Sequence, residues 1–563
     1  MSQVASGVDS LGESGERTTV RPSLPREKRA AFLHLYRSML AASITDEIEI
    51  ELVHGGEAFF HLGTQGHEGA AVLHLSLTEA DWLFPHYRDK SLMLARGLTP
   101  AMFFHTLLCT AAAPSAGRQM IPFLGDASRR IMSLNIPVGN HALQAVGVAS
   151  VVKDDPARPI VLCGLGDGTT QQGEVYEAIA EAVRSDLPVL FWIEDNGLSI
   201  STTTVGKTFF SLPGKKPYQF FGQPIHRLNG RDVVACHEEV EKIVSAMRVQ
   251  RRPALVVFEV ERLCNHTNAD DERTYRPAAE IQAARQGGNP IHLLAGHLLR
   301  SGISRQELDQ VAAEVRDQVR EAADSARRMG DPKPVWHAKK PLPPEGMDPA
   351  REYRGTPEAP RLTMLEAMNQ VLRRRLAEDP RVTLYGEDIE DPKGDVFGLT
   401  RGLTRAFPGR VINSALSEAT ILGVSIGRAL AGARPVAMIQ FADFLPQALN
   451  QIMSELGSMY WRTNGDWECP VLVLVACGGY RPGLGPFHAQ TMEAIAAHVP
   501  GLDVFMPSTA ADAAGLLNAA FDSGRPTIFF YPKVSLNDRE RTTSADLERH
   551  WVPIGQARRV RQG

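Results

Sequence analysis

"GLGDGTTQQGEVYEAIAEAVRSDLPVLFWIEDNGLSIS", residues 164–201, contains a segment of helical periodicity followed by an apolar run. Residues 160–163, just before it, form another short and continuous apolar run, which is typical of a strand buried on both faces. From Glu174, apolar residues recur at helical spacing, and Pro188 then introduces the second run at 189–193. The pattern predicts a βαβ unit, whose right-handed crossover makes its two strands parallel.

Asp167 and Asn196 each follow one of these predicted strands. The carboxyl ends of parallel strands share one edge of a sheet, which is where open α/β sheets bind ligands. Two oxygen ligands, several glycines and a helix N-terminus together suit a magnesium-like ion bound to phosphate. From the residues alone, a tight turn and a strand terminator remain the simpler interpretation. A dinucleotide fingerprint is disfavoured, because Thr169 occupies the position of its third glycine.

The 563-residue chain, with 43% hydrophobic residues, has the composition of a globular protein of several domains. Its net charge of -5 and the lack of a basic stripe argue against a nucleic-acid partner. The six cysteines are scattered without metal-ligand spacing, which favours reduced thiols in a cytoplasmic protein and indicates no zinc site. Residues 1–28 are polar, so we expect a disordered segment there rather than a signal peptide, and we expect no membrane span.

Two α/β modules are predicted, with a proline-rich linker between them. The first module, 29–330, ends after an amphipathic helix capped by Ser304. The linker, 331–360, contains eight prolines and no sustained hydrophobic period. In the second module, 361–540, helical stretches alternate with apolar strands, so we expect each module to hold a mostly parallel sheet flanked by helices. The strands predicted in the second module are 382–385, 436–441, 471–476, 504–506 and 527–531.

Several motifs resemble those of the 2-oxo acid dehydrogenases, which use thiamine diphosphate. The stretch from GDG at 166–168 to Asn196 resembles their cofactor motif, although Asp195 departs from the usual Asn-Asn pair. The surroundings of this stretch are similar to the α subunit of these enzymes. The second module is similar to the β subunit, through "YGEDIEDPKGDVFGLTRGL", "LSEATILGVSIGRALAGARPVAMIQFADF" and "FHAQTMEAIAAHVPGL". The resemblance covers everything from the start of the first module except the linker, and it implies two thiamine-diphosphate-binding folds fused in one chain.

The resemblance implies a site for thiamine diphosphate and Mg2+ in the first module. Asp167, Asn196 and the backbone carbonyl of Leu198 are the residues that would hold the metal ion. These are the hard oxygen ligands that Mg2+ prefers. The other cofactor-binding residues implied around the same motif are Val138, Gly166 and Gly168.

The phosphate end of the cofactor is matched by two further segments. "FPHYRDKSLMLARG" resembles the segment that grips the diphosphate through Tyr87 and Arg88, and a planar guanidinium suits phosphate oxygens. Without the resemblance, a surface ion pair between Arg88 and Asp89 is the simpler interpretation. The polar stretch 264–276 follows an apolar strand and is similar to the family's mobile active-site loop. Its His266 would reach the phosphate end and the reacting intermediate.

In the second module, the resemblance implies acid–base and pocket residues. Glu418 would hydrogen-bond the cofactor's aminopyrimidine and promote loss of the thiazolium proton, whereas helix capping is the alternative from sequence alone. Glu387 would link two active sites through acids and water, and His488 would lie beside the acyl-transfer site. Phe444 and Phe441 would line the pocket, although phenylalanines near a strand end are often plain core residues.

The implied reaction is oxidative decarboxylation of a small 2-oxo acid, with transfer of the acyl group to a lipoylated dihydrolipoamide acyltransferase. "NADDERTYR" at 268–276 and "IFFYPK" at 528–533 favour a branched-chain acid such as 3-methyl-2-oxobutanoate. A pyruvate or acetoin dehydrogenase component is the enzymatic alternative, and a transketolase-like carboligase is disfavoured by the order of the modules. We expect a homodimer, because neither module alone encloses the cofactor in this family.

Residues 541–563 resemble the approach to a further α/β domain of the β subunits, and the sequence ends where that domain would begin. We therefore expect this C-terminal domain to be absent from the chain. A second hypothesis follows from that expectation: a thiamine-diphosphate-binding protein without turnover, which serves regulation or assembly. Retention of the implied catalytic residues favours the enzyme over this alternative.

Overall fold

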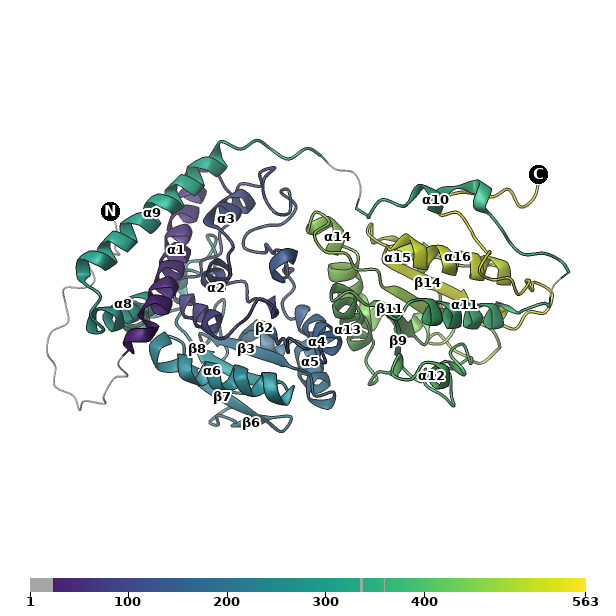
Figure 1. Ribbon diagram of the computed structural model, residues 1–563, viewed down its shortest axis with the longest axis horizontal. Helices are drawn as coiled ribbons and strands as arrows, with labels where there is room; N and C mark the ends of the chain where they lie inside the picture. Colours follow the sequence, from purple (N-terminus) through teal and green to yellow (C-terminus); the bar gives the residue numbers. More distant parts are fainter. Residues whose placement is uncertain (1–23, 335–337, 359, 563) are drawn as a thin grey trace.

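The computed structural model describes residues 24–334, 338–358 and 360–562. Most of the expected disordered segment, residues 1–23, therefore lies outside the described residues. Two α/β modules lie side by side, the first coloured purple to teal and the second green to yellow (Figure 1). Within the described residues each module holds a six-stranded, largely parallel sheet flanked by helices, which confirms the predicted fold class.

The first module is built on a sheet whose strands are parallel except at one end. Its spatial order is β1 (Trp82–Phe84), β2 (Val161–Gly166), β3 (Val189–Asp195), β8 (Ala254–Glu259), β7 (Gln223–Asn229) and β6 (Gln219–Phe220), with only the β6–β7 pair antiparallel among these described strands. The predicted βαβ unit is present, because α5 (Gly173–Arg184) connects the parallel strands β2 and β3. Two short strands, β4 (Leu198–Ser199) and β5 (Thr202–Thr203), form a separate antiparallel pair.

Both faces of this sheet are buried, as the continuous apolar runs predict. Along β2, Val161 and Cys163 belong to a core cluster shared with α4 (His141–Val152) and α5, whereas Leu162 belongs to a second cluster. That second cluster includes residues of α1 (Arg29–His54), α6 (Val233–Gln250) and α9 (Arg305–Arg327), and α9 is capped by Ser304. The remaining α-helices of the described module are α2 (Lys90–Ala95), α3 (Pro100–Leu107), α7 (Ala278–Gly287) and α8 (Pro290–Arg300).

The second module has an entirely parallel sheet within the described residues. Its spatial order is β10 (Val411–Asn413), β9 (Val382–Gly386), β11 (Arg434–Ile439), β12 (Leu472–Cys477), β14 (Thr527–Pro532) and β13 (Asp503–Phe505). Every strand predicted from the sequence overlaps one of these, and only β10 was not predicted. The helices are α11 (Met364–Glu378), α12 (Leu403–Ala406), α13 (Glu418–Leu430), α14 (Met459–Arg462), α15 (Glu493–Ala497) and α16 (Ala510–Ser523).

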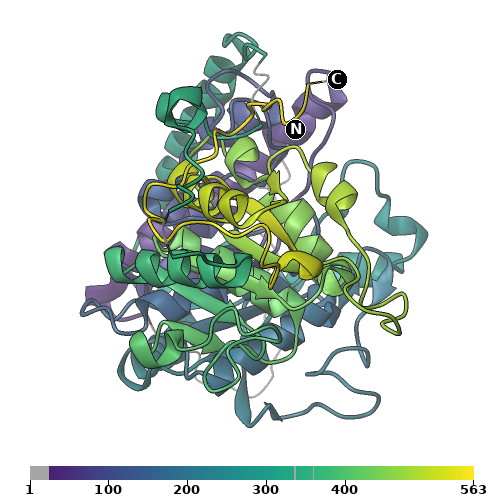
Figure 2. The same ribbon diagram turned by 90° about the vertical axis from the view of Figure 1, so that its right-hand side faces the viewer.

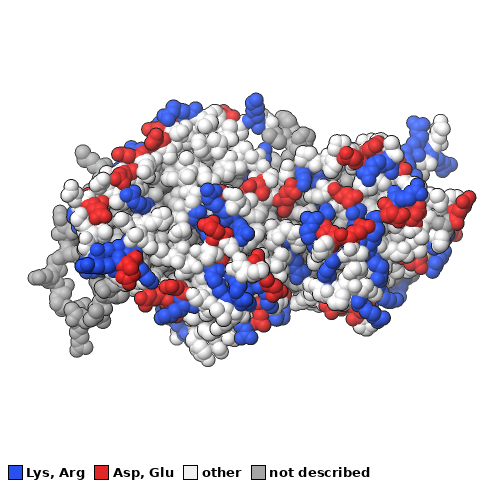
Figure 3. Space-filling model, viewed as in Figure 1, with Lys and Arg blue, Asp and Glu red and all other residues white. Residues whose placement is uncertain are grey.

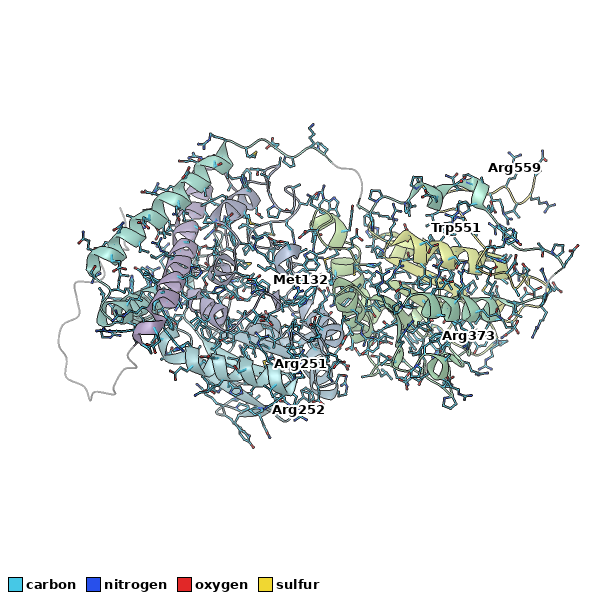
Figure 4. The ribbon with its side chains drawn as sticks, viewed as in Figure 1. Met132, Arg251, Arg252, Arg373, Trp551 and Arg559 are labelled. Atoms are coloured by element: carbon cyan, nitrogen blue, oxygen red, sulfur yellow. The ribbon has the colours of Figure 1, made fainter. Side chains whose placement is uncertain are left out.

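The linker and the end of the chain pack together on the second module. The linker contains the short helix α10 (Pro344–Met347), and its residues 335–337 and 359 lie outside the described residues. Tyr353 and Trp551 exchange backbone hydrogen bonds of 3.1 and 3.0 Å. The buried Trp551 ring, labelled in Figure 4, lies 3.9 Å from the Arg351 guanidinium and joins the core cluster of this module. Residues near the chain end thus complete the core of the second module.

The two modules contact each other through α4 and α13 (Figure 1). Glycines let these helix backbones approach closely: a Cβ at Gly427 would lie 2.0 Å from the carbonyl oxygen of Gln144. A Cβ at Gly147 would likewise lie 2.2 Å from the carbonyl oxygen of Val424. One core cluster includes residues of both helices and of both sheets, and Figure 2 shows the second module in front of the first along this contact. This packing fixes the position of one module relative to the other.

The face of the molecule shown in Figure 3 carries charges of both signs without a large patch of either one. Lys and Arg side chains intermingle with Asp and Glu over the face shown in Figure 3. Within the described residues, no helix combines the length and the apolar character that crossing a lipid bilayer requires.

Candidate active site

The carboxyl ends of β2 and β3 place Asp167 and Asn196 at one edge of the first sheet. Asp167 accepts hydrogen bonds from the backbone N–H of Gly168 at 2.8 Å and from the Thr204 hydroxyl at 2.6 Å. The Asn196 side-chain oxygen accepts the Leu198 N–H at 3.0 Å. Burial raises the pKa of Asp167 to about 7, so a bound cation at this carboxylate would offset the cost of its charge. The donor set fits a hard divalent ion.

A second group of side chains follows β1 and β8 at the same edge. Arg88 is buried and donates hydrogen bonds to the carbonyl of Gly63 and, at 2.9 Å, to Nδ1 of His266. The Arg88 guanidinium also lies 5.2 Å from the centre of the Tyr87 ring. Arg88 forms no ion pair with Asp89 in the described structure, so the surface ion pair that sequence alone allowed is not formed. The structure thus brings Tyr87, Arg88 and His266 together.

The loop that carries His266 is held by its own polar residues. Asp270 accepts the His266 N–H at 2.8 Å and the Tyr275 hydroxyl at 2.6 Å, while Arg262 donates to that hydroxyl at 2.6 Å. Burial and the nearby Arg88 guanidinium lower the pKa of His266 to about 4. The imidazole is therefore neutral near pH 7 and can accept a hydrogen bond from Arg88.

A narrow cleft opens beside these residues, between the strand end of β2 and the segment before α4. Val138 and Gly166, both implied cofactor contacts, line it together with Tyr87, Phe123 and His86. Glycine is required at 168, because a Cβ there would lie 2.7 Å from the Ser199 hydroxyl. The cleft therefore reaches the backbone of the predicted metal-binding turn.

Three fully buried polar residues behind this edge were not predicted from the sequence. Glu194 accepts a short hydrogen bond from Nδ1 of His67 and a 3.2 Å bond from Nδ1 of His86. His67 Nε2 in turn contacts the side-chain amide of Asn196 at 3.1 Å. Burial lowers the pKa of His86 to about 3 and raises that of Glu194 to about 7, and it holds the pKa of His67 well below its usual value. The site thus extends one layer deeper than the predicted ligands.

In the second module, Glu418 is the first residue of α13 and is buried. The hydroxyl of Ser417, rather than Glu418, caps this helix by accepting the Thr420 N–H at 3.1 Å. Glu177 of α5 accepts hydrogen bonds from the Ser417 and Thr420 hydroxyls at 2.7 and 2.9 Å. Burial and then the charge of Glu177 raise the pKa of Glu418, so its carboxyl holds a proton more readily than an exposed one. No sequence motif predicted a role for Glu177.

Glu387 follows β9 and lies near the same helix start. Burial, and after it the charge of Glu418, raise the pKa of Glu387 to about 7. Within the described residues, one of its carboxylate oxygens is buried without a hydrogen-bond partner. A carboxyl in this state can exchange a proton near neutral pH.

Aromatic side chains fill the carboxyl edge of the second sheet. The ring of His488, an exposed residue, lies 4.9 Å from that of Phe441 and 5.7 Å from that of Phe444. The buried Lys533 donates to the His488 carbonyl at 2.6 Å, and its ammonium lies 4.7 Å from the Phe441 ring centre. The structure therefore groups the three pocket residues that the resemblance implied.

The predicted site residues form two groups in this chain. One surrounds Asp167 and Arg88 in the first module, and the other surrounds Glu418 and Phe444 in the second. Among the described residues, no hydrogen bond or ring contact joins the two groups directly. The elements between them, α5 and α13, are linked through Glu177.

Comparison with known protein families covers both modules. The family described as "Dehydrogenase E1 component" matches residues 36–335, and "Transketolase, pyrimidine binding domain" matches residues 361–538. The 2-oxoisovalerate dehydrogenase subunit beta of Bacillus subtilis is 41% identical over 203 residues, covering 36% of this chain and 61% of that protein. The mitochondrial 2-oxoisovalerate dehydrogenase subunit alpha of Mus musculus is 27% identical over 316 residues, covering 56% of this chain and 70% of that protein.

A pyruvate dehydrogenase E1 component subunit beta, from Mycoplasma pneumoniae, is also similar. It is 36% identical over 200 residues, covering 35% of this chain and 60% of that protein. The chain thus spans about three fifths of the length of the beta subunits that it matches. Beta subunits named for two different 2-oxo acids resemble this chain to a comparable degree.

Proposed function

Because the chain belongs to the dehydrogenase E1 component family, we propose that it catalyses oxidative decarboxylation of a 2-oxo acid with thiamine diphosphate and Mg2+. The matches confirm the predicted order of an alpha-type module followed by a beta-type module in one chain. The relatives' names state an activity and a substrate for those proteins, and we propose the same activity and substrate class for this chain.

The observation that carries the proposal is the convergence of anion- and cation-binding groups at one sheet edge. Asp167 and Asn196 supply hard oxygen ligands, while the buried Arg88 offers donors that suit a diphosphate. His266 and Tyr87 lie against Arg88 and complete a wall around the phosphate position. A site for a metal ion and a diphosphate together would explain why buried groups of both signs lie at this one edge.

Bound thiamine diphosphate would supply a thiazolium carbon that adds to the 2-oxo group and accepts electrons as carbon dioxide leaves. The residues of the chain would hold the cofactor in position and exchange protons with it. Arg88 would bind phosphate oxygens, and Asp167 and Asn196 would hold the ion between them. The raised pKa of Glu418 suits a carboxyl that shares its proton with a ring nitrogen. Burial of Glu418 excludes water from that proton transfer.

We favour a branched-chain substrate such as 3-methyl-2-oxobutanoate. The support is the similarity to beta and alpha subunits named for 2-oxoisovalerate, together with the rings of Phe441 and Phe444 at the second sheet edge. A small apolar side chain packs well against such rings. Pyruvate remains the second candidate, because a pyruvate dehydrogenase beta subunit is also similar. The acyl group would pass to a lipoylated dihydrolipoamide acyltransferase.

We further propose that the protein works as a homodimer. The two groups of predicted site residues do not touch within the described part of one chain, so a second copy would supply the complementary group to each site. Light scattering should give the mass of a dimer. A monomer that binds one cofactor per chain would contradict this arrangement.

Metal-dependent cofactor binding tests the proposal directly. Thiamine diphosphate should raise the melting temperature only when a divalent ion is present, because the ion neutralises the repulsion between phosphate and Asp167. Asp167→Ala should abolish the shift. Asp186→Ala, an exposed acid just past the opposite end of α5, is the matched control and should keep it. An equal shift in the presence of a chelator would refute the metal site.

A further inference from the structure

We propose that His67 and Glu194 are a positioning pair that orients the side-chain amide of Asn196 toward the metal ion. The inference rests on the proposed function, because it assigns a task to residues behind the predicted metal ligand. Neither residue has been placed in the site by the sequence motifs. Both side chains are fully buried, and 127 positions separate them in the chain.

The contacts form a continuous line from the protein interior to the ligand edge. Glu194 is the penultimate residue of β3, and its carboxylate bonds Nδ1 of His67, which immediately precedes the 3-10 helix at Glu68–Leu75. The other ring nitrogen, Nε2, lies 3.1 Å from the amide nitrogen of Asn196. His86 makes a second bond to the same Glu194 oxygen at 3.2 Å.

Hydrogen-bond chemistry fixes the direction of each bond. The Leu198 N–H can only donate, so the Asn196 atom that it contacts at 3.0 Å is the oxygen. The Asn196 nitrogen then faces His67, and because an amide nitrogen only donates, His67 Nε2 must accept. The proton of the neutral imidazole is therefore on Nδ1, where Glu194 accepts it. Glu194 thus selects the tautomer that keeps the amide in place.

The orientation matters because the two ends of an amide have opposite effects on a cation. With the amide nitrogen bound to His67, the Asn196 oxygen stays on the side of Leu198, another predicted metal ligand. If the amide rotated by half a turn, its N–H2 group would replace a ligand oxygen with a donor that repels the ion. Residues behind metal ligands commonly control affinity in this way, and their loss costs roughly 10- to 100-fold in metal binding.

A separate metal site at His67, His86 and Glu194 explains the contacts less well. Their nearest ligand atoms lie within 4.8 Å of one another, which is compact enough for an ion. However, Nδ1 of each histidine points at the same Glu194 oxygen at hydrogen-bonding distance. Nitrogens that donate protons have no lone pair for a metal ion. The cluster is therefore a hydrogen-bonded support for Asn196.

Two substitutions at His67 test the two hydrogen bonds of its imidazole one at a time. His67→Asn keeps a donor near Glu194 but removes the acceptor that reaches Asn196, whereas His67→Gln keeps an acceptor at the position of Nε2. The matched control is His297→Asn, which removes another buried imidazole bonded to a carboxylate, Asp232, at 3.0 Å. Isothermal titration of the full-length protein with thiamine diphosphate in saturating Mg2+, and with Mg2+ in saturating thiamine diphosphate, measures both affinities without turnover.

We expect His67→Asn to weaken Mg2+ binding by roughly 10- to 100-fold, and His67→Gln and His297→Asn by less than about 3-fold. Wild-type affinity in His67→Asn, or equal losses in both His67 variants, would overturn the positioning pair. If His67→Asn does not fold, Glu194→Gln carries the test: loss of the selected tautomer should weaken Mg2+ binding, and unchanged binding overturns the inference. A wild-type protein that binds no thiamine diphosphate refutes the proposed function itself, which is a distinct outcome.

Discussion

The carboxyl edges of the two sheets carry different side chains, and the sheets also differ in strand order. At the first edge, buried side chains hold one another through hydrogen bonds, as Glu194 holds His67 and Asp167 accepts from Thr204. At the second edge, Phe444 and His488 meet edge to face at the rim, and Glu387 and Glu418 are acids with raised pKa values. The first edge therefore presents a hydrogen-bonded polar socket, and the second presents a more apolar and acidic wall.

This contrast indicates which end of a ligand each edge receives. Preformed donors and oxygen ligands suit a charged diphosphate and its metal ion. Burying such charges costs free energy unless partners are already in place to bind them. Acids with raised pKa values and aromatic rings suit an uncharged heterocycle and proton transfer. The close packing of α4 against α13 keeps the two modules in a fixed relation.

The largest effect is expected at Glu418, where we propose that the second edge carries out proton transfer. Glu418→Gln keeps the shape and most hydrogen bonds but removes the ionisable group. Decarboxylation should fall by roughly 10²- to 10⁴-fold, the usual contribution of acid–base catalysis, while the fold survives. Exchange of the thiazolium proton, followed by nuclear magnetic resonance, should slow in parallel.

Ser417→Ala is the control for this prediction, because the Ser417 hydroxyl caps α13. It should cost about 1 kcal/mol of stability and leave proton exchange nearly unchanged. If Glu418→Gln instead lost only stability and exchanged at the wild-type rate, the second edge would have a structural role alone.

A smaller effect is expected at Arg88, which represents the preformed first edge. Arg88→Lys replaces a planar fork by a single ammonium that cannot keep both the Gly63 and His266 contacts. Affinity for thiamine diphosphate, measured by titration calorimetry, should fall by about 10- to 100-fold. Arg251→Lys is the control, since Arg251, labelled in Figure 4, is buried and donates to the Lys153 carbonyl at 2.9 Å away from the cleft. Equal affinity in both variants would show that the first edge is not a phosphate socket.

The smallest effect concerns Glu387, whose raised pKa makes stability depend on pH. Its folded pKa of about 7 exceeds the usual 4.5, so between these values the folded state keeps a proton that the unfolded state releases. Glu387 therefore destabilises the fold progressively as pH rises through this window. Glu387→Gln should stabilise the protein by about 1 kcal/mol or less above pH 7, because solvent reaches part of the side chain.

Urea unfolding of both proteins at several pH values measures this difference. The advantage of Glu387→Gln should shrink as the pH falls toward 5, where the wild-type carboxyl is protonated in the folded state. A constant difference at every pH would mean that Glu387 is ionised throughout and well solvated.

Much of the fold could be predicted because its signals are local. The run at 189–193 is continuous, apolar and introduced by Pro188, so it predicts β3 without knowledge of the rest. The predicted cap Ser304 marks the start of α9, and in the structure its hydroxyl accepts the Glu307 N–H at 3.1 Å. In contrast, β10 has only three residues, Val411–Asn413, which is too short for a hydrophobic pattern to stand out.

The site was only partly predictable, because its deeper layer depends on tertiary contacts. Asp167 and Asn196 stand out in the sequence, since glycines and strand ends surround them. His67 is a single histidine in a glycine-rich stretch, and Glu194 reads as the end of an apolar strand. No local pattern relates two residues 127 positions apart, and only the sheet brings them into contact. Likewise, Glu177 meets Ser417 only because the two modules pack together.

Turnover of a 2-oxo acid tests the central claim most directly. The purified full chain should be assayed for decarboxylation of 3-methyl-2-oxobutanoate, pyruvate and 2-oxoglutarate with an artificial electron acceptor, with and without thiamine diphosphate and Mg2+. The account predicts activity that requires both cofactors, is highest with 3-methyl-2-oxobutanoate and is lost in Glu418→Gln. Cofactor binding without turnover of any of the three acids would contradict it and would support a non-catalytic thiamine-diphosphate-binding protein.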